Sequence, residues 1–226
     1  MAFDTELLKQ RCGFLRSVDL HETISSTNAR AKELGLAGAE EGTLVIAENQ
    51  TAGRGRLGRT WCTGCGRPGD FLTFSLILRP TLSPEDASMI TPTAALAVSD
   101  ALRDVCNLQT EIKWPNDILR NGRKLCGILT EGYFRDAEYF AVLGIGINLN
   151  AEGMPASVAD TATGVFPETG RKTSPEELTG DVCNAFFRYY GILQKQKNLE
   201  ELKQIYNERC LPGQEIDGRG QLLSSI

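Results

Sequence analysis

The dipeptide Asn121-Gly122 restricts the possible folds strongly, because it lies between two apolar runs of the sequence. Asn-Gly favours the tight turn of a β-hairpin, so the strands on either side of it should pair antiparallel. Other strand-like runs follow without the regular strand–helix alternation that a parallel sheet requires. We therefore expect an α+β fold in which a mixed, largely antiparallel β-sheet packs against helices. Strands are predicted at 43–47, 71–79, 111–113, 118–120, 125–131 and 139–149.

Serine residues mark the starts of the predicted helices. Ser26 is a suitable cap for the stretch that follows it. Ser83 precedes a proline and two acids, which favour the first turn of a helix. Ser174 and Glu177 fit a capping box, and apolar residues follow at helical spacing. Helices are predicted over 27–35, from 83 to about 106, from 174 through 193, and over 198–210.

Composition limits the class of protein. A chain of 226 residues can build one good-sized core with a small appendage. Its formal net charge of -5 argues against general nucleic-acid binding, so a basic site must be local. No apolar run approaches the roughly 20 residues of a membrane helix. The first residues do not form a signal peptide. We expect no nucleic-acid or membrane partner.

The cysteines and the histidine restrict the chemistry. Seven scattered cysteines are typical of reduced thiols in a cytoplasmic protein. His21 is the one histidine of the chain, which excludes most catalytic designs based on histidine and most zinc sites. Cys62 and Cys65 form an isolated C-x-x-C, interpreted as coincidental loop cysteines. We expect no metal site built from His or Cys.

A loop of alternating glycine and arginine follows the first buried strand. Gly53 to Arg59 reads Gly-Arg-Gly-Arg-Leu-Gly-Arg, and no acidic residue lies between Glu48 and Asp70. Arginine forks suit phosphate and carboxylate oxygens, and the glycines let the backbone approach a ligand. The stretch also matches G-x-G-x-x-G, but the residues that follow do not form a helix, which argues against a dinucleotide site. We expect this loop to bind a small, phosphate-bearing anion.

Two further clusters lie at strand ends. Lys113-Trp-Pro-Asn-Asp117 follows one predicted strand, and Arg123 and Lys124 precede another that contains Gly127. A glycine inside a strand allows close approach of a flat or chain-like group. Gly144-Ile-Gly-Ile-Asn148 ends a third strand. Each cluster alone could be a turn or a tightly packed strand.

Together, in this order, the motifs resemble those of the biotin protein ligases. The matching segments are Ser26-Thr-Asn28, 48–61, Lys113 to Asp117, 124–131 and 144–148. The resemblance implies a catalytic domain of the class II synthetase and biotin/lipoate ligase type. It implies ATP, Mg²⁺ and biotin as ligands, a biotinyl-5'-AMP intermediate, and transfer to a lysine of a biotin carboxyl carrier protein domain.

The resemblance also implies roles for individual residues. Those expected to bind biotin are Ser26, Thr27, Asn28, Gln50, Gly53, Arg54, Lys124 and Gly127. Those expected to bind the nucleotide are Arg56, Arg59, Trp61, Lys113, Asn116 and Asn148. Those expected to act in catalysis are Arg54, Arg56, Lys124 and Asp117. The loop 53–67 is expected to close over the adenylate.

Two alternatives of related function stay open. One is a lipoate ligase or lipoyl transferase of the same fold, although the chain lacks the glycine triplet typical of that group. The other is a non-catalytic biotin-binding protein. The stretch before His21 is too short for a helix-turn-helix domain, so we expect none. Residues 1–210 are expected to form the catalytic domain and 211–226 a remnant of an SH3-like β-domain. The sequence leaves a homodimer open.

Overall fold

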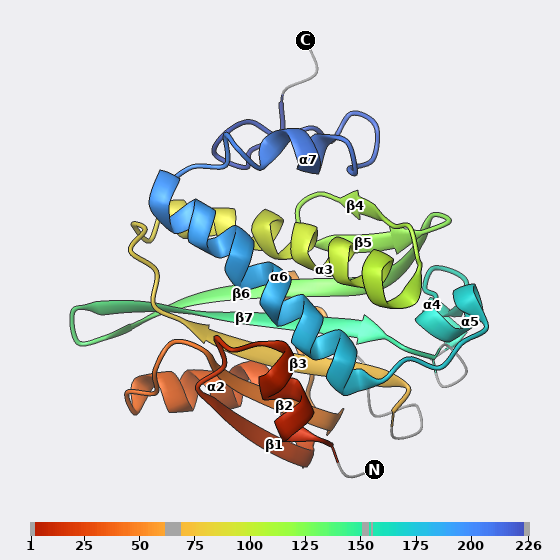
Figure 1. The fold of residues 1–226 in the computed structure, drawn as a ribbon, viewed down its shortest axis with the longest axis horizontal. Helices are drawn as coiled ribbons and strands as arrows, with labels where there is room; N and C mark the ends of the chain where they lie inside the picture. Colours follow the sequence, from red (N-terminus) through yellow and green to blue (C-terminus); the bar gives the residue numbers. More distant parts are fainter. Residues whose placement is uncertain (1–2, 62–68, 151–153, 155, 224–226) are drawn as a thin grey trace.

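One seven-stranded sheet forms the centre of the molecule in the computed structural model, which describes residues 3–61, 69–150, 154 and 156–223 (Figure 1). Its strands lie in the order β1-β2-β3-β7-β6-β5-β4. β1 and β2 pair parallel, and the remaining neighbours pair antiparallel. The predicted mixed, largely antiparallel α+β fold is therefore confirmed. The strands are β1 Ser17–Ile24, β2 Thr43–Gln50, β3 Phe71–Leu78, β4 Glu111–Lys113, β5 Asp117–Arg120, β6 Arg123–Arg135 and β7 Glu138–Asn148.

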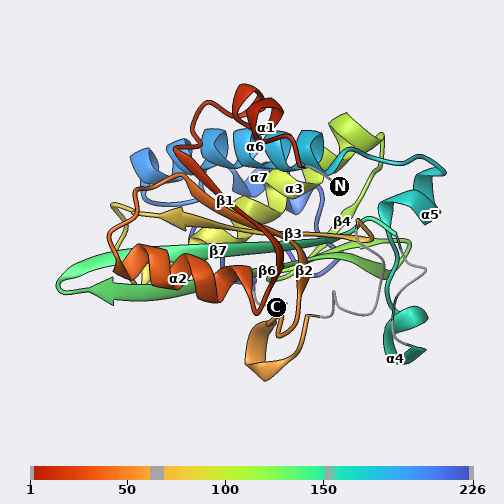
Figure 2. The same ribbon diagram turned by 90° about the horizontal axis from the view of Figure 1, so that it is seen from below.

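Helices cover both faces of the sheet. α2 lies on one face, and α1, α3 and α6 lie on the other (Figure 2). Because β3 is covered on both sides, all eight of its residues are buried. No described helix is long and apolar enough to span a membrane. The helices are α1 Thr5–Arg11, α2 Thr27–Leu36, α3 Ile90–Cys106, α4 Ala156–Ala159, α5 Val165–Thr169, α6 Pro175–Gln196 and α7 Lys203–Asn207, with 3₁₀ turns η1 Arg56–Gly58 and η2 Asp86–Met89.

A small apolar cluster fixes α2 on the sheet. α2 connects the parallel strands β1 and β2, and Ala31 on its inner side is completely buried. Burial of such side chains contributes on the order of 25 cal/mol per Å² of apolar surface. The first residues of α2 are thereby held above β3 and β7. The cluster comprises Ala31, Val45, Ile77, Phe140 and Val142.

The local turn and cap predictions are confirmed. Asn121 and Gly122 both have left-handed φ angles, of 50° and 72°, as the hairpin turn between β5 and β6 requires. The Ser26 side chain accepts the backbone N–H of Ala29 at the start of α2. Ser174 accepts the N–H of Glu177 in the same way for α6. The return bond of a capping box is replaced, because Glu177 pairs with Arg11 of α1.

The helix predicted to start at Ser83 is wrong in its first part. The chain forms the 3₁₀ turn η2 at Asp86–Met89, and α3 begins at Ile90. Pro92 explains the boundary, because proline has no N–H to donate to an earlier turn and fits only the first turn of a helix. Ser83 still accepts the N–H of Asp86.

Several other elements differ from the predictions, and the short helices α4 and α5 were not expected. α1 and β1 are present but were not expected, since β1 is an edge strand with no clear alternation of buried and exposed residues. The helix predicted over 198–210 is only α7, Lys203–Asn207. The N–H of Leu199 instead bonds to the carbonyl of Gly218, 2.7 Å away, which diverts the chain before α7.

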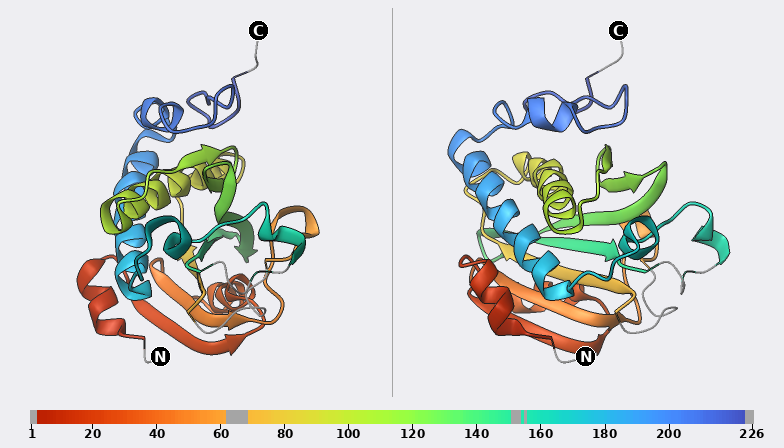
Figure 3. Two further views of the ribbon diagram at one scale, coloured as in Figure 1. Left: turned by 90° about the vertical axis from the view of Figure 1, so that its right-hand side faces the viewer. Right: turned by 45° about the vertical axis from the view of Figure 1, so that its right-hand side comes forward.

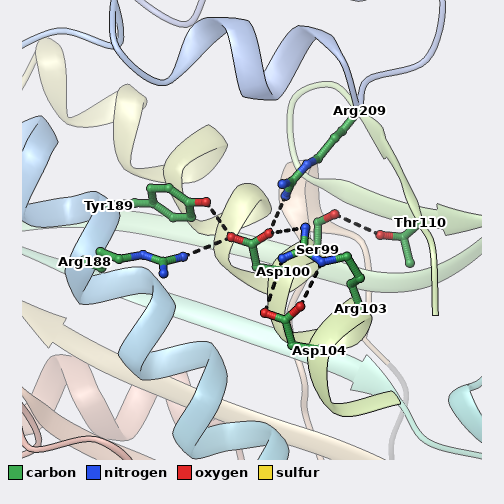
Figure 4. A network of polar contacts seen from close by, with 8 residues as sticks. All are labelled: Ser99, Asp100, Arg103, Asp104, Thr110, Arg188, Tyr189 and Arg209. Atoms are coloured by element: carbon green, nitrogen blue, oxygen red, sulfur yellow. Dashed lines mark hydrogen bonds and ion pairs between the residues drawn. The ribbon is translucent and has the colours of Figure 1, made fainter. Parts of the chain in front are cut away.

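Asp100 joins α3, α6 and the segment after α7 (Figure 4). Its carboxylate pairs with Arg103, Arg188 and Arg209, and accepts the hydroxyl of Tyr189. Burial alone would raise the pKa of this carboxyl, but the Tyr189 hydroxyl and the arginines outweigh it and hold the pKa below its usual value. An ionised Asp100 therefore fastens the two long helices to each other and to the C-terminal segment.

The residues after α7 pack on the end of the sheet that carries β4 (Figure 3). Leu211 N–H bonds to the carbonyl of Ile112, and the side-chain carbonyl of Gln214 accepts the backbone N–H of Trp114 at 2.7 Å. The Trp114 indole donates to the carbonyl of Gly220, and Ile216 is buried in the main core. The division of the chain at residue 210 stays a prediction.

Candidate functional site

A cleft of about 420 Å³ opens on the face of the sheet that carries α2. Its walls come from the start of α2, the loop after β2, the turn between β4 and β5, and the strands β6 and β7. These segments are far apart in the sequence and meet only through the sheet order. The cleft is therefore a product of the fold rather than of one local motif.

Glycines make the floor of the cleft flat. Gly127 of β6 and Gly146 of β7 lie opposite each other in the strand register. The indole of Trp61 lies against both, and a Cβ at either position would overlap its ring. Gly144, two residues before Gly146 and so on the same face, leaves room for the Asn28 amide in the same way. The indole Nε1 has no acceptor among the described residues.

The arginine–glycine loop closes on itself before it leaves the cleft. Trp61 N–H bonds to the carbonyl of Gly53 at 3.0 Å, and Gly55 N–H to that of Arg59 at 2.7 Å. Leu57 lies at the tip with a left-handed φ of 55° and 88% of its surface exposed. The loop is a short hairpin with a 3₁₀ turn and not the start of a helix, as its sequence predicts.

Two arginines fasten this hairpin to other segments of the cleft. Arg54 donates to Glu131 Oε2 on β6 at 2.8 Å. Arg56 donates to Asn116 Oδ1 in the turn before β5 at 3.1 Å. Asn116 is itself held to β6, since its Nδ2 donates to the carbonyl of Ile128. The loop is therefore tied both to β6 and to the turn before β5. The rest of the expected lid, with Cys62 and Cys65, lies outside the described residues.

Positive charge dominates the cleft. Lys124 Nζ lies 2.7 Å from Asp117 Oδ1 and 5.6 Å from the centre of the Trp61 ring. Lys113 has no ion-pair partner among the described residues, and Asp117 is the acidic residue in the lining. In a chain of net charge -5, this reversal of sign favours a polyanion. The basic side chains are Arg54, Arg56, Arg59, Lys113 and Lys124.

A second group of lining residues, at the start of α2 and the end of β2, forms a neutral end of the cleft that is buried and polar but uncharged. Gln50 Oε1 accepts the backbone N–H of Thr27 at 2.8 Å, at the first turn of α2. Buried polar groups of this kind are costly unless they are paired, so their positions are closely fixed. Such an end suits a neutral group with both donors and acceptors. The residues there are Ser26, Thr27, Asn28 and Gln50, each no more than 6% exposed.

The predicted site residues converge in this cleft, with two exceptions. Gly53 does not line it, although its carbonyl holds the backbone of Trp61. Asn148 is also behind the surface, where its Nδ2 donates to the carbonyls of Lys124 and Thr163. Asn148 thus holds the start of β6, and its contact with a nucleotide stays a prediction. The predicted site residues that do line the cleft are Ser26, Thr27, Asn28, Gln50, Arg54, Arg56, Arg59, Trp61, Lys113, Asn116, Asp117, Lys124 and Gly127.

Several neighbours of the site had no predicted role. Trp114, Gly144 and Gly146 line the cleft, and all three lie inside motifs that the sequence makes visible. Thr73 also lines it, but a threonine in a buried strand gives no signal in the sequence. Glu131 lies directly behind the lining, where it pairs with Arg54.

The residues of the cleft restrict its chemistry. Cys126, next to Gly127 but packed in the core rather than in the lining, has the pKa of its thiol raised far above the usual value by burial, which keeps it protonated and excludes it as a nucleophile. Among the described residues, no group of three or more His, Cys, Asp or Glu side chains could hold a metal ion. The cleft can supply fixed positive charge, a flat apolar floor and a neutral polar end.

Comparison with known proteins agrees with this arrangement. The model of the biotin/lipoate A/B protein ligase family matches residues 20–148. The bifunctional ligase/repressor BirA of Bacillus subtilis is 43% identical over 173 residues, which are 75% of this chain and 52% of that protein. The biotin–[acetyl-CoA-carboxylase] ligase of Paracoccus denitrificans is 40% identical, over 74% of this chain and 70% of its own length. The chain thus spans about half the length of the first of these relatives.

A solved structure shows the same fold. The biotin protein ligase from Aquifex aeolicus, in complex with biotin and ATP, superposes with a TM-score of 0.76 and 29% sequence identity. The match covers 87% of this chain and 79% of that one.

Proposed function

Because the chain belongs to the biotin/lipoate A/B protein ligase family, we propose that it activates biotin with ATP and transfers the biotinyl group to a protein lysine. A carboxylate oxygen of biotin attacks the α-phosphorus of ATP, and the bond to the β-phosphate breaks to release pyrophosphate. The lysine amine of a biotin carboxyl carrier protein domain then attacks the acyl carbon of biotinyl-5'-AMP, and AMP leaves.

The observation that carries this proposal is the joining of a neutral polar end and a basic end in one cleft. The first step brings a carboxylate onto a polyphosphate, and two unit charges about 4 Å apart repel by ~1 kcal/mol in water and ~4 kcal/mol at an effective dielectric constant of 20. Fixed positive charge must offset this repulsion, and five basic side chains line the cleft. No side-chain nucleophile is needed.

The geometry suggests how the two ligands would lie. The ureido ring of biotin fits the polar end, with Ser26, Thr27, Asn28 and Gln50 around it. Its carboxylate would then point along the floor toward Lys124, which lies beside Asp117. The family resemblance suggests Gly53, Arg54 and Gly127 as the frame of this pocket.

The nucleotide would occupy the basic end. Arg56, Arg59 and Lys113 can neutralise phosphates, Trp61 offers a flat face, and Asn116 fixes Arg56. Mg²⁺ would enter with the phosphates, since it is commonly bound by one or two carboxylates together with substrate oxygens. Asp117 is the carboxylate of the lining that could bind the Mg²⁺ ion. Alternatively, it could orient the acceptor lysine.

Pyrophosphate exchange into ATP tests the first step. We expect exchange that depends on biotin, followed by transfer of labelled biotin to a carrier domain on addition of that domain. Exchange with lipoate alone would instead support a lipoate ligase of the same fold. Biotin binding without any exchange would support a non-catalytic binding protein.

We also propose that the protein works in the cytoplasm. The described cysteines Cys12, Cys106, Cys126, Cys183 and Cys210 are free thiols, which suits a reducing compartment. Fractionation of cells that produce the tagged protein would test this placement, and recovery from a secreted fraction would contradict it.

A further inference from the structure

Four side chains form a continuous polar chain from β6 to the neutral end of the cleft. Glu131 Oε2 lies 2.7 Å from Asn28 Nδ2, and Asn28 Oδ1 lies 2.6 Å from Ser75 Oγ. Ser75 Oγ lies 2.8 Å from Thr27 Oγ1. Ser75 is completely buried, while Asn28 and Thr27 are 5% and 4% exposed. Of the four, Thr27 and Asn28 line the cleft, whereas Glu131 and Ser75 do not.

The carboxylate at one end fixes the direction of the first bonds. An ionised carboxylate only accepts hydrogen bonds, so the amide nitrogen of Asn28 must face Glu131. The carbonyl of Leu129, 3.4 Å from the same nitrogen, is a second acceptor on that side. The Asn28 carbonyl oxygen therefore faces Ser75 and takes its single hydroxyl proton.

The distances then decide where the Thr27 proton points. With its proton committed to Asn28, Ser75 Oγ can only accept. Thr27 Oγ1 lies 2.8 Å from Ser75 Oγ and 3.2 Å from Gln50 Oε1. If Thr27 donated to Gln50, two lone pairs would face each other at the shorter distance. Donation to Ser75 avoids this and leaves Gln50 Oε1 to the backbone N–H of Thr27.

We propose that Glu131 and Ser75 are positioning residues that make the neutral end of the cleft selective for a ligand with an N–H donor. Through Asn28 they turn the Thr27 hydroxyl away from the ligand as a donor, so Thr27 Oγ1 presents lone pairs to the cleft. This inference rests on the proposed function, because the cyclic urea of biotin carries two such N–H groups.

The same arrangement opposes a lipoyl ligand. The dithiolane ring of lipoate has no N–H, so it could not donate to the Thr27 hydroxyl oxygen. Sites built to bond a polar substrate group reject an analogue that lacks it by up to about 10⁴-fold, because buried groups are then left unpaired. Glu131 and Ser75 would contribute to that selectivity without touching either ligand.

Substitutions at the two hidden positions test the inference in the full-length protein. Glu131→Ala removes the acceptor that sets the direction, whereas Glu131→Gln retains one acceptor oxygen. Ser75→Ala breaks the chain without touching Arg54, which also donates to Glu131. Loss of a buried hydrogen bond should raise the KM for biotin in pyrophosphate exchange about tenfold in Glu131→Ala and Ser75→Ala. Glu131→Gln should stay within about threefold of the unsubstituted protein.

A change in the KM for biotin without a change in the KM for ATP or in kcat would distinguish a positioning role from damage to the whole site. In Ser75→Ala, which leaves the pair of Arg54 and Glu131 in place, the KM for ATP and the kcat should change less than about twofold, and the preference for biotin over lipoate should fall with the rise in biotin KM. Matched controls are Ser99→Ala, a buried serine on the opposite face of the sheet, and Glu138→Gln, an exposed carboxylate at the far end of the β6–β7 hairpin. Neither control should alter the KM for biotin.

The outcomes distinguish the two levels of the proposal. Absence of biotin-dependent exchange in the unsubstituted protein would overturn the proposed function itself. Normal exchange there, with an unchanged biotin KM in both Glu131→Ala and Ser75→Ala, would overturn only the role of the polar chain. Equal losses for biotin and ATP in Ser75→Ala would likewise contradict a positioning role, because they would indicate damage to the whole site.

Discussion

The ammonium of Lys124 lies 2.7 Å from Oδ1 of Asp117, across the neighbouring strands β5 and β6. Lys124 is thereby held in the lining of the cleft, close to the face of Trp61. The pair is one-fifth to one-third exposed, so its value for stability is small. The main effect of the pair is to fix the position of the Lys124 ammonium in the cleft.

Lys124→Ala should therefore reduce adenylate formation far more than it changes stability. Removing a fixed charge that faces the developing transition state costs about 10²- to 10³-fold in rate. We expect such a loss in biotin-dependent pyrophosphate exchange, and a melting temperature within about 2 °C of the unsubstituted protein. Lys124→Arg, which keeps the charge, is the matched control. An unchanged exchange rate in Lys124→Ala would remove this residue from the mechanism.

Asp100→Asn tests the junction of α3, α6 and the C-terminal segment. Breaking a buried pair costs about 3–5 kcal/mol, and we expect ~2–3 kcal/mol here because Arg188 and Arg103 remain partly in water. Urea unfolding at neutral pH measures the loss. Asp104→Asn, which removes an exposed partner of Arg103, should cost less than about 1 kcal/mol.

The same junction predicts a pH dependence. The pKa of Asp100 is lowered in the folded protein by Tyr189 and the arginines, against the effect of burial. Its stabilising contribution is therefore complete above the unfolded value of about 3.9 and is lost as the pH falls through the lower folded value. The stability difference between the unsubstituted protein and Asp100→Asn should shrink below about pH 4. A constant difference from pH 7 to pH 3 would contradict this linkage.

Gly146→Ala should displace the Trp61 indole from the floor of the cleft. A methyl group there overlaps the ring, and overpacking of this kind costs about 1–3 kcal/mol. We expect the KM for ATP to rise about tenfold and the tryptophan emission to shift. Gly191→Ala is the control, because a Cβ at Gly191 meets nothing within 4 Å. Unaltered emission and KM in Gly146→Ala would show that the ring does not depend on this glycine.

Gln214→Ala tests the hold of the C-terminal segment on the turn between β4 and β5. The change leaves the Trp114 N–H without its acceptor, which should cost about 1 kcal/mol. In a Trp61→Phe background, Trp114 is the single remaining tryptophan and its emission should shift to longer wavelength. Gln214→Glu retains an acceptor and should restore the emission. Gln221→Ala, an exposed change in the same segment, should have no effect.

Local signals predicted those parts of the fold that depend on neighbouring residues. Asn121-Gly122 specifies a turn by its own φ preferences, and Ser26 and Ser174 cap helices through bonds to residues three positions on. β1 was not predicted because it lies at an edge of the sheet, and its buried and exposed residues do not alternate clearly. The start of α3 was misplaced because Ser83 and Pro84 outweighed the evidence of Pro92.

The composition of the site was predictable, but its internal bonds were not. The motifs identified Arg54, Lys124 and Gly127, since these residue types carry charge or leave space. The sequence does not indicate that Glu131 accepts from Asn28, which lies 103 positions away. Such a pair depends on the order of β3, β7 and β6, which only the assembled sheet defines.

Because of the order of the strands, ligand binding in the cleft should affect the unfolding of the whole sheet. Its walls come from β2 on one side of the sheet and from β5 and β4 on the other, with β3, β7 and β6 between them. Local unfolding of the strands at either side would destroy the binding site. A ligand bound in the cleft would therefore stabilise the whole sheet. At a free concentration 100 times its Kd, such a ligand would add ~2.7 kcal/mol to the free energy of unfolding. Amide protons in strands far from the ligand would then exchange more slowly, in step with those beside it.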